Sequence, residues 1–211
     1  MLRKASKGDL HALAHVYKNS FPDSMRHIFG GPPPDQPLVD IYGFLLDEFP
    51  DYFLVAEEEG EVAGYVIAPP DISPLVRHAL LRGYALRWAW RWLTGRYGFG
   101  VRVAWILLAD KLALLANKGK AAENSDARIL SVAVDPAHQG KGLGMQLAVA
   151  GIDLLRKAGA ESVMLEVRAN NGAALHLYRK LGFHEVGRFE DKVGVWIQMV
   201  THVRPAAEKA A

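Results

Sequence analysis

The sequence contains no cysteine among its 211 residues. This absence excludes disulfides, thiolate metal sites and a cysteine nucleophile, and with them several enzyme classes. The N-terminal stretch 1–18 is too polar to provide the apolar core of a signal peptide, so we expect a cytoplasmic protein. The length and an apolar fraction of 50% allow one substantial core, which favours a single domain over 1–203 followed by a flexible tail over 204–211.

Acidic residues are nearly absent from one part of the chain. Between Arg77 and Lys120, nine basic residues accompany a single acidic one, Asp110, which leaves 16 basic and 22 acidic residues elsewhere. Six arginines and four of the five tryptophans lie in this region: Arg77, Arg82, Arg87, Arg91, Arg96, Arg102, Trp88, Trp90, Trp92 and Trp105. Its helical pattern, unlike that of the flanking strands, predicts a helical insertion over 70–125.

Elsewhere the chain alternates between strand and helix patterns, which predicts an α/β fold. The expected strands cover 2–6, 52–56, 61–67, 129–135, 162–167, 184–189 and 193–200. The expected helices cover 9–20, 38–49, 74–93, 101–117, 141–158 and 172–181. The stretch 21–37 holds the run Gly30-Gly31-Pro32-Pro33-Pro34 and is expected to be a loop, because proline lacks a backbone donor and glycine adds conformational entropy.

A glycine-rich segment stands between the predicted buried strand 129–135 and the long helix 141–158. It reads Gln139-Gly140-Lys141-Gly142-Leu143-Gly144. Glycine lets a backbone approach a ligand closely, and the free N–H groups at a helix N-terminus attract phosphate oxygens, so this segment predicts a diphosphate site. An ordinary strand-to-helix turn is the structural alternative. The segment lacks the Gly-Lys-Ser/Thr ending of a nucleotide P-loop, and it comes too late to open a Rossmann unit.

This segment resembles the Gln/Arg-x-x-Gly-x-Gly/Ala signature with which enzymes of the GNAT acetyltransferase superfamily hold the diphosphate of coenzyme A. The stretch 165–183 resembles the motif that follows in the same family, with Asn171, Tyr178 and Gly182-Phe183 at the expected spacing. It is most similar to the motif of the ribosomal-protein alanine N-acetyltransferases. The likeness covers 129–186 and implies a mixed, twisted sheet that is splayed at its centre and flanked by helices, with the insertion before the coenzyme-binding strand.

The resemblance also implies the ligands and the site residues. Acetyl-CoA would be the cosubstrate, no metal would be needed, and the acetyl group would pass to an amine by direct attack in a ternary complex. By similarity, the coenzyme would be received by Val132, Val134, Gln139, Gly140, Lys141, Gly142, Leu143 and Gly144, with Asn171 on the pantetheine side. Glu166 would act as base, Tyr178 would protonate the departing thiolate, and the Val134 N–H, at a bulge, would bind the oxyanion.

Several alternatives stay open at this point. Glu166 could face solvent or pair with Arg168, and Tyr178 could be a core residue. A thioester is already activated, so the main free-energy cost of the reaction is removal of a proton from the acceptor amine. At pH 7 this deprotonation costs about 4–5 kcal/mol for a lysine-like amine but about 1 kcal/mol for an α-amine. The acceptor is therefore open between a protein N-terminus and a small amine. A protein of the same fold that binds acyl-CoA without turnover is the competing class.

The insertion has three explanations that the sequence does not separate. Its segment 74–117 could cap the acceptor site or form a homodimer interface, make a peripheral membrane contact, or add core beneath a solvated basic rim. Trp88 and Trp92 share a helical face that Trp90 does not, so apolar and charged faces are poorly separated. Asp110 interrupts the most apolar run, which argues against a membrane span. Nucleic acid is not an expected partner, because the rest of the chain is anionic.

Overall fold

The computed structural model describes residues 1–100, 103, 127–191 and 194–203, and the structural statements below concern these residues. The predicted helix 101–117, which contains Arg102 and Trp105, and the predicted tail 204–211 lie outside them. The helices are α1 (Leu10–Ser20), α2 (Pro22–Phe29), α3 (Asp35–Glu48), α4 (Leu75–Leu81), α5 (Tyr84–Leu93), α7 (Leu143–Lys157) and α8 (Gly172–Lys180). The strands are β1 (Leu2–Lys4), β2 (Phe53–Glu58), β3 (Glu61–Ile67), β4 (Arg128–Ile129), β5 (Ser131–Val134), β6 (Ser162–Arg168), β7 (His184–Asp191) and β8 (Gly194–His202).

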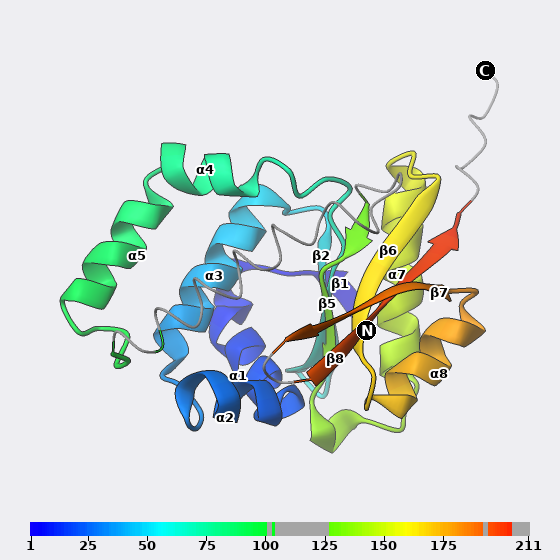
Figure 1. The fold of residues 1–211 in the computed structure, drawn as a ribbon, viewed down its shortest axis with the longest axis horizontal. Helices are drawn as coiled ribbons and strands as arrows, with labels where there is room; N and C mark the ends of the chain where they lie inside the picture. The colour runs from blue at the N-terminus through cyan, green and yellow to red at the C-terminus, as the bar shows by residue number, and fades with distance from the viewer. Residues whose placement is uncertain (101–102, 104–126, 192–193, 204–211) are drawn as a thin grey trace.

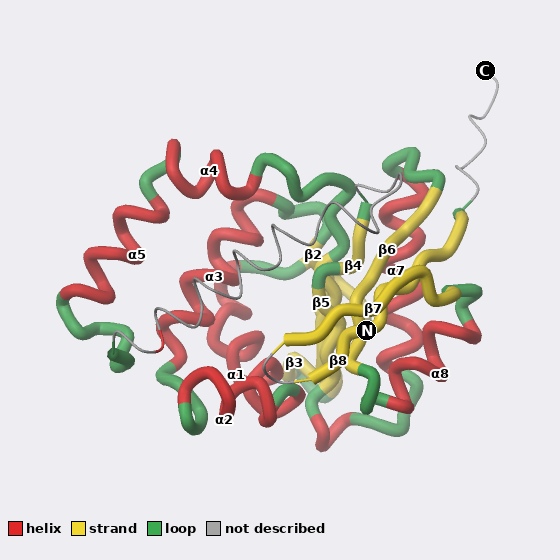
Figure 2. The backbone as a smooth tube through the Cα atoms, viewed as in Figure 1, coloured by secondary structure: helices red, strands yellow, loops and turns green. Residues whose placement is uncertain are grey.

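The described strands form two four-stranded sheets (Figures 1 and 2). The first has the order β1-β2-β3-β5 and is antiparallel throughout. The second has the order β4-β6-β8-β7, in which β4 and β6 are parallel and the other pairs are antiparallel. The predicted mixed α/β architecture is therefore confirmed.

The predicted strand 129–135 is divided between the two sheets. Its first part joins them, because the Arg128 N–H donates to Pro69 O (3.2 Å) on one side while β4 pairs with β6 on the other. At Leu130 the N–H donates to Ile67 O (2.8 Å) although Ser131 is the residue opposite Ile67, so two residues face one, as in a β-bulge. Beyond this point β5 pairs with β3 alone, and the strands of the two sheets part.

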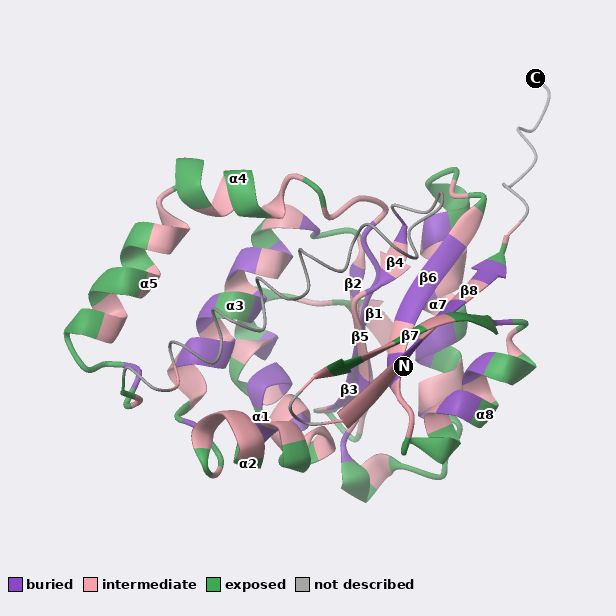
Figure 3. Ribbon diagram, viewed as in Figure 1, coloured by how far each residue is buried: buried purple, intermediate pink, exposed green. Residues whose placement is uncertain are grey.

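Helices cover both faces of the first sheet. On one face, α1 and α3 close a core with β2, β3 and β5 that includes Leu13, Val16, Tyr42, Phe53 and Tyr65. On the other face, α7 packs so closely that a Cβ on Gly151 would lie 2.9 Å from Val66 Cγ2. The same core continues through α8 and the inner residues of the second sheet, so β6 and the first sheet are buried together (Figure 3).

The expected loop at 21–37 is wrong in its first half, which forms α2. Pro22 stands at the first turn of this helix, where a missing N–H leaves no bond unmade, and Gly30 ends it with a left-handed φ of 78°. The next helix begins at Asp35, three residues before the predicted start, because Pro37 again falls in a first helical turn. Proline and glycine here mark helix ends rather than the absence of helix.

The expected helix 74–93 consists of two helices, α4 and α5, which meet at Gly83. Gly83 has a φ of 76°, a backbone conformation outside the right-handed helix. Both helices lie on the outer side of α3, which stands between α5 and the sheets (Figure 1). The described part of the insertion therefore does not cover the place where the sheets part.

Side chains of α3 hold the insertion in place. The Phe44 ring packs against Tyr84 and Trp88, with centroid distances of 4.8 and 5.5 Å. Three carboxylates of α3 receive polar groups of the insertion: Asp40 from Arg91 and Tyr97, Asp47 from Tyr84, and Glu48 from His78 and Arg82. The basic composition of the insertion thus has a structural use, because part of its charge neutralises one acidic helix.

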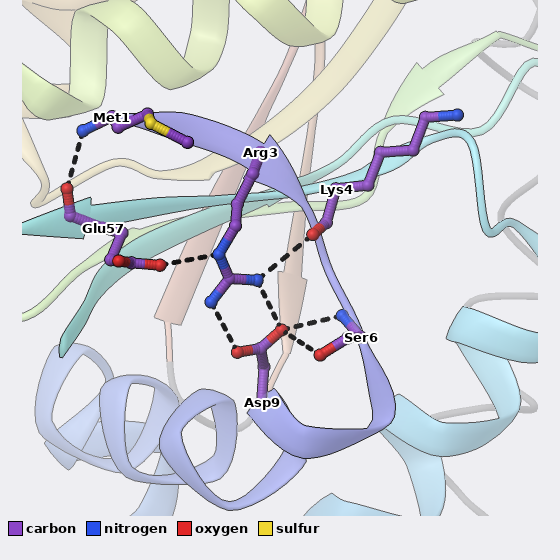
Figure 4. A network of polar contacts seen from close by, with 6 residues as sticks. All are labelled: Met1, Arg3, Lys4, Ser6, Asp9 and Glu57. Carbon is purple, nitrogen blue, oxygen red and sulfur yellow. Dashed lines mark hydrogen bonds and ion pairs between the residues drawn. The ribbon is translucent and has the colours of Figure 1, made fainter. Parts of the chain in front are cut away.

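At the N-terminus, Asp9 fastens β1 to the helix that follows (Figure 4). Its two carboxylate oxygens accept two bonds from the Arg3 guanidinium, each 2.8 Å, and one oxygen also accepts the Ser6 N–H (2.7 Å). Arg3 also binds Glu57 of β2 at 2.7 Å. The hydrogen bonds from Arg3 lower the pKa of Asp9 to about 2, against the opposing effect of burial.

Replacing Asp9 by asparagine tests this network. Because the folded-state pKa lies below the ordinary value, the stabilisation is complete above about pH 4 and is lost as the pH falls through about 2. We expect Asp9→Asn to lower the free energy of unfolding by about 1–2 kcal/mol at pH 7, and the difference from wild type to shrink toward pH 2. Urea unfolding followed by circular dichroism measures both. The control is Asp51→Asn, which removes an exposed ion pair with Lys4 and should change the free energy of unfolding little. If the difference between Asp9→Asn and wild type stays constant with pH, the Asp9 carboxylate does not have the stabilising role assigned to it.

Candidate active site

The outer edge of β5 carries unused main-chain groups. The Asp135 N–H donates to Ala63 O (2.8 Å), and in an antiparallel ladder every second residue bonds to the partner strand. Ala133 therefore bonds to β3, while the N–H groups of Val132 and Val134 point to the opposite edge. This edge faces the side from which β6 has parted, so both predicted coenzyme residues present backbone donors there. The bulge expected at Val134 lies earlier, at Leu130.

The glycine-rich segment folds as a sharp turn into α7. A short 3-10 helix at Pro136–His138 follows β5, and Gly140 and Gly142 then adopt left-handed φ values of 81° and 82°. A Cβ at either glycine would meet nothing within 4 Å, so backbone conformation and not crowding selects glycine here. Gly142 is the N-cap of α7, and no side chain caps this helix. Its first N–H groups therefore have no capping side chain, a feature that suits an anion.

Side chains of α1 and of the turn itself fasten this turn. The Asp135 carboxylate accepts the Ala137 N–H (3.0 Å) and the Asn19 amide (2.8 Å) from α1. The Val134 carbonyl accepts the Ser20 hydroxyl (3.0 Å) and the Gln139 side-chain amide (2.9 Å). Burial acts to raise the pKa of Asp135, but the bonds from Asn19 and Ala137 outweigh it and the pKa is lowered. The turn therefore has a fixed shape before any ligand arrives.

Three predicted loop residues have structural partners of their own. Lys141 forms an ion pair with Glu58 of the β2–β3 hairpin at 2.8 Å, and its hydrogen bond lowers the pKa of Glu58. Leu143 is buried in the core beneath α7. At Gly144 a Cβ would lie 3.5 Å from a Leu177 methyl carbon, so the small residue sets the approach of α8 to α7. Because their side chains or Cα positions are engaged in these contacts, the backbone N–H groups of these residues are the groups that a ligand can contact.

Asn171 caps α8. Its side-chain oxygen accepts the Ala174 N–H at 3.1 Å, the bond by which an N-cap residue satisfies a helix start. The predicted contact with pantetheine would then fall to the amide nitrogen of the same side chain. The sequence predicted Asn171 as a residue that binds the ligand, and the structure shows it as the N-cap of α8.

The two predicted catalytic residues lie on opposite faces of β6. Tyr178 of α8 packs in the core on the helix side, with its ring edge to face against Phe183 at 5.7 Å. Glu166 alternates with the buried Leu165 and Val167, so its side chain lies on the other face, where the Gln198 amide donates to it at 3.2 Å. The alternative in which Glu166 pairs with Arg168 is not formed among the described residues.

Arg168 instead closes the β7–β8 hairpin. Its guanidinium donates two bonds to the Asp191 carboxylate (2.7 and 2.9 Å) and lies 3.9 Å from the centre of the Trp196 ring. The Trp196 indole N–H donates to the same carboxylate at 2.8 Å. Burial raises the pKa of Tyr17 on α1, while the charge of Arg168 acts to lower it.

Burial holds the Tyr178 hydroxyl in its protonated form to higher pH than usual. Removal of its hydroxyl from water raises the pKa of Tyr178 to about 12, so the phenol is neutral at physiological pH. Among the described residues the hydroxyl has no hydrogen-bond partner. A neutral phenol can donate a hydrogen bond to a ligand atom.

Comparison with known proteins places these features in a family. The sequence profile of the Acetyltransferase (GNAT) family matches residues 11–183. The chain belongs to the GNAT acetyltransferase family. The match runs from α1, whose Asn19 and Ser20 fasten the glycine-rich turn, to Phe183 beside Tyr178.

Relatives of this GNAT protein match it over part of its length. It is 35% identical over 104 residues to a [Ribosomal protein bS18]-alanine N-acetyltransferase from Salmonella typhimurium, covering 49% of this chain and 69% of that one. It is 48% identical over 60 residues to the Escherichia coli K12 protein of that name, covering 28% and 40%. A mycothiol acetyltransferase from Renibacterium salmoninarum is 58% identical over 52 residues, 25% of this chain but 15% of that protein. The chain thus spans less than half of the last two proteins.

Solved structures agree in fold. The structure of SsHAT superposes with a TM-score of 0.67 at 20% identity, covering 96% of this chain and 97% of that one. A putative acetyltransferase of Salmonella typhimurium, yncA, solved with acetyl-CoA, gives a TM-score of 0.60 at 20% identity and covers 100% and 98%. The splayed mixed sheet of the GNAT fold is therefore confirmed for this chain.

Sequence reasoning missed the residues that shape the site without belonging to either motif. Asn19, Ser20 and Asp135 hold the turn, and Gln198 binds Glu166 from the neighbouring strand. Asp135 could have been found, because an aspartate before a proline at the end of a strand is a common turn-forming residue. Asn19 is 116 residues from Asp135 in the sequence, and Gln198 is 32 residues from Glu166, so no local pattern indicates either contact.

The capping role of Asn171 is tested by two substitutions. We expect Asn171→Ala to lower the free energy of unfolding by about 1 kcal/mol, because the Ala174 N–H loses its partner. Asn171→Asp keeps an oxygen at the cap and adds a charge that is favourable at a helix N-terminus, so its stability should match wild type. Urea titration at pH 7 compares the three proteins, and equal losses in both variants would show that the cap is unimportant.

Proposed function

We propose that this protein transfers an acetyl group from acetyl-CoA to a primary amine by direct attack within a ternary complex. The observation that carries the proposal is the conjunction of the uncapped start of α7 at Leu143 with the open edge of β5, which ends nine residues earlier at Val134. Membership of the GNAT family and the acetyltransferase names of its relatives support it. We place the enzyme in the cytoplasm, on the sequence expectation.

The coenzyme would be held mainly by backbone groups. The N–H groups from Gln139 to Gly144 suit diphosphate oxygens, because the helix dipole favours negative charge there and both glycines leave the approach clear. The outward N–H and C=O of Val132 suit an amide of the pantetheine arm, as an added strand would, and the Val134 N–H points to the same side. Asn171 would contribute its amide nitrogen. No described group of three or more histidine or acidic residues could hold a metal ion, and the proposed reaction uses none.

Glu166 is proposed as the base that receives a proton from the attacking amine. Its carboxylate is half-buried, and the Gln198 bond leaves its second oxygen without a hydrogen bond to any described residue. For an α-amine with a pKa near 8, only about 1 kcal/mol is needed to reach the neutral form at pH 7. A weak base such as a carboxylate is adequate for that acceptor, which favours an α-amine over a lysine side chain.

Tyr178 is proposed to act on the departing sulfur. Full proton transfer from a phenol of pKa about 12 to a thiolate, with an ordinary pKa of about 8.5, is uphill by about 3.5 pKa units. We therefore assign Tyr178 chiefly as a hydrogen-bond donor that stabilises charge developing on sulfur, with proton transfer completed late. The Val134 N–H is the proposed donor to the tetrahedral oxyanion.

The acceptor is proposed to be the α-amine of a protein or peptide. The names of two relatives specify a ribosomal-protein alanine, and the stretch 165–183, which contains Glu166 and Tyr178, resembles the motif of enzymes of that kind. The name of a third specifies mycothiol, so a small amine is the second candidate. A panel of α-amino peptides, lysine-containing peptides with blocked N-termini and small amines, read by release of free thiol, would separate these classes.

Binding of the coenzyme at the turn is tested with Gly142→Asp. A carboxylate at the start of α7 would repel the diphosphate, so we expect titration calorimetry to show at least a hundredfold weaker association with acetyl-CoA. Gly95→Asp is the matched control, because Gly95 also has a left-handed φ (72°) and open space around it, but lies in the insertion. Equal affinity in wild type and Gly142→Asp would refute the role of the turn.

Catalysis is tested with Tyr178→Phe and Glu166→Gln, each assayed with the acceptor found in the panel. We expect Tyr178→Phe to lower kcat by about 10- to 100-fold, as for loss of a hydrogen bond to a charged group, with acetyl-CoA affinity unchanged. Glu166→Gln should lower kcat most at low pH, where the amine is mainly protonated. Turnover that neither substitution slows would remove both assignments, and acetyl-CoA binding without turnover on any acceptor would favour a sensor.

A further inference from the structure

The insertion carries most of the exposed apolar surface of the described chain. Ten large hydrophobic side chains are exposed, and six of them lie between Val76 and Leu93: Val76, Leu80, Leu81, Leu86, Trp90 and Leu93. Leu81, Leu86 and Leu93 are each more than 70% exposed, and Trp90 is 63% exposed. Single exposed hydrophobic residues are ordinary on protein surfaces, but such a concentration marks a contact surface.

The geometry of α5 separates two apolar faces. Tyr84 and Trp88 are one turn apart and pack inward on Phe44 of α3. Leu86, Trp90 and Leu93 follow the same helical spacing on the opposite side and have no such cover. The sequence suggested poorly separated faces, but Trp88 completes the core and Trp90 points outward. Figure 3 shows α4 and α5 as largely exposed helices at the end of the molecule remote from α8.

Cations surround this surface without acidic neighbours in sequence. From Ile72 to Gly100 the chain has five arginines and no aspartate or glutamate. Arg82 and Arg91 form ion pairs with Glu48 and Asp40 of α3. Arg77, Arg87 and Arg96 are exposed and form no ion pair with a described residue, although Arg87 stacks over the Tyr84 ring at 4.7 Å.

We propose that the α4–α5 surface, defined by the six apolar residues above with Arg77, Arg87 and Arg96, docks on an anionic phospholipid bilayer. Leucine and tryptophan side chains would enter the interface, while arginines bind lipid phosphates from its rim. Among the described residues no helix has the length and hydropathy to cross a membrane, so the contact is peripheral. A second copy of the chain fits less well, because a twofold interface would bring cationic surfaces together.

The place of this surface leaves the proposed active site free. The ion pairs of His78 and Arg91 and the ring contact of Trp88 fix the insertion to α3. Helix α3 lies between α5 and the sheets (Figure 1). The start of α7 and the open edge of β5 are on the far side of α3. The bound enzyme would therefore face the lipid with one end while coenzyme and acceptor enter at the other. This inference does not depend on the proposed reaction.

Vesicle sedimentation with the full chain tests the proposal. We expect binding to vesicles of equal parts phosphatidylglycerol and phosphatidylcholine, at least tenfold weaker binding to pure phosphatidylcholine, and further weakening as salt is raised from 50 to 500 mM. Leu86→Ser combined with Trp90→Ser should reduce binding at least tenfold. The control Val149→Ser combined with Val186→Ser alters exposed residues elsewhere and should leave binding unchanged.

The charge contribution has its own variants. Arg77→Gln combined with Arg96→Gln should weaken binding to the anionic vesicles about tenfold, whereas Arg156→Gln combined with Arg188→Gln, in α7 and β7 at the other end of the molecule, should not. Circular dichroism and thermal unfolding verify that each variant is folded. Failure of the folded wild type to bind anionic vesicles overturns the proposal, as does equal loss in variants and controls. Light scattering that shows a dimer abolished by Leu86→Ser and Trp90→Ser would assign the surface to a second copy instead.

Discussion

The parting of β5 from β6 is the constraint on which the rest of this structure depends. The two sheets share hydrogen bonds only as far as Leu130, where a bulge turns the strand toward β3 alone. Beyond it, the outer edge of β5 has no neighbouring strand in the described chain. In most sheets an open edge invites aggregation, and proteins cover it. Here the next elements along the chain turn the edge into a binding surface.

The turn into α7 provides the second half of that surface. A helix whose first N–H groups have no cap would normally lose stability, because those donors are left to water or to a ligand. The surrounding bonds from Asn19, Ser20 and Asp135 hold the turn in shape despite this loss. Pre-organised backbone donors need little rearrangement on binding, so the affinity gained from a diphosphate is not consumed by ordering the loop. Stability given up at the turn is thus recovered when the ligand binds.

Much of this arrangement could be predicted from the sequence. The hairpin around Glu59, the strand before the glycine-rich segment and the helices α7 and α8 follow from short-range periodicity and turn chemistry, which act within a few residues. The helix at Pro22–Phe29 was missed because proline and glycine were taken as breakers, whereas they stand at its two ends. Tertiary packing, which no local sequence pattern indicates, determines the Arg3–Asp9 bonds and the Gln198–Glu166 pair. It also determines that Trp88 packs against α3 while Trp90 is exposed.

A crystal structure of the chain grown with coenzyme A tests the central claim most directly. The account predicts the diphosphate at the main-chain N–H groups of Gly140 to Gly144, and the pantetheine arm along the outer edge of β5, between that strand and β6. Coenzyme bound anywhere else, or a diphosphate held by side chains with the start of α7 unused, would contradict it.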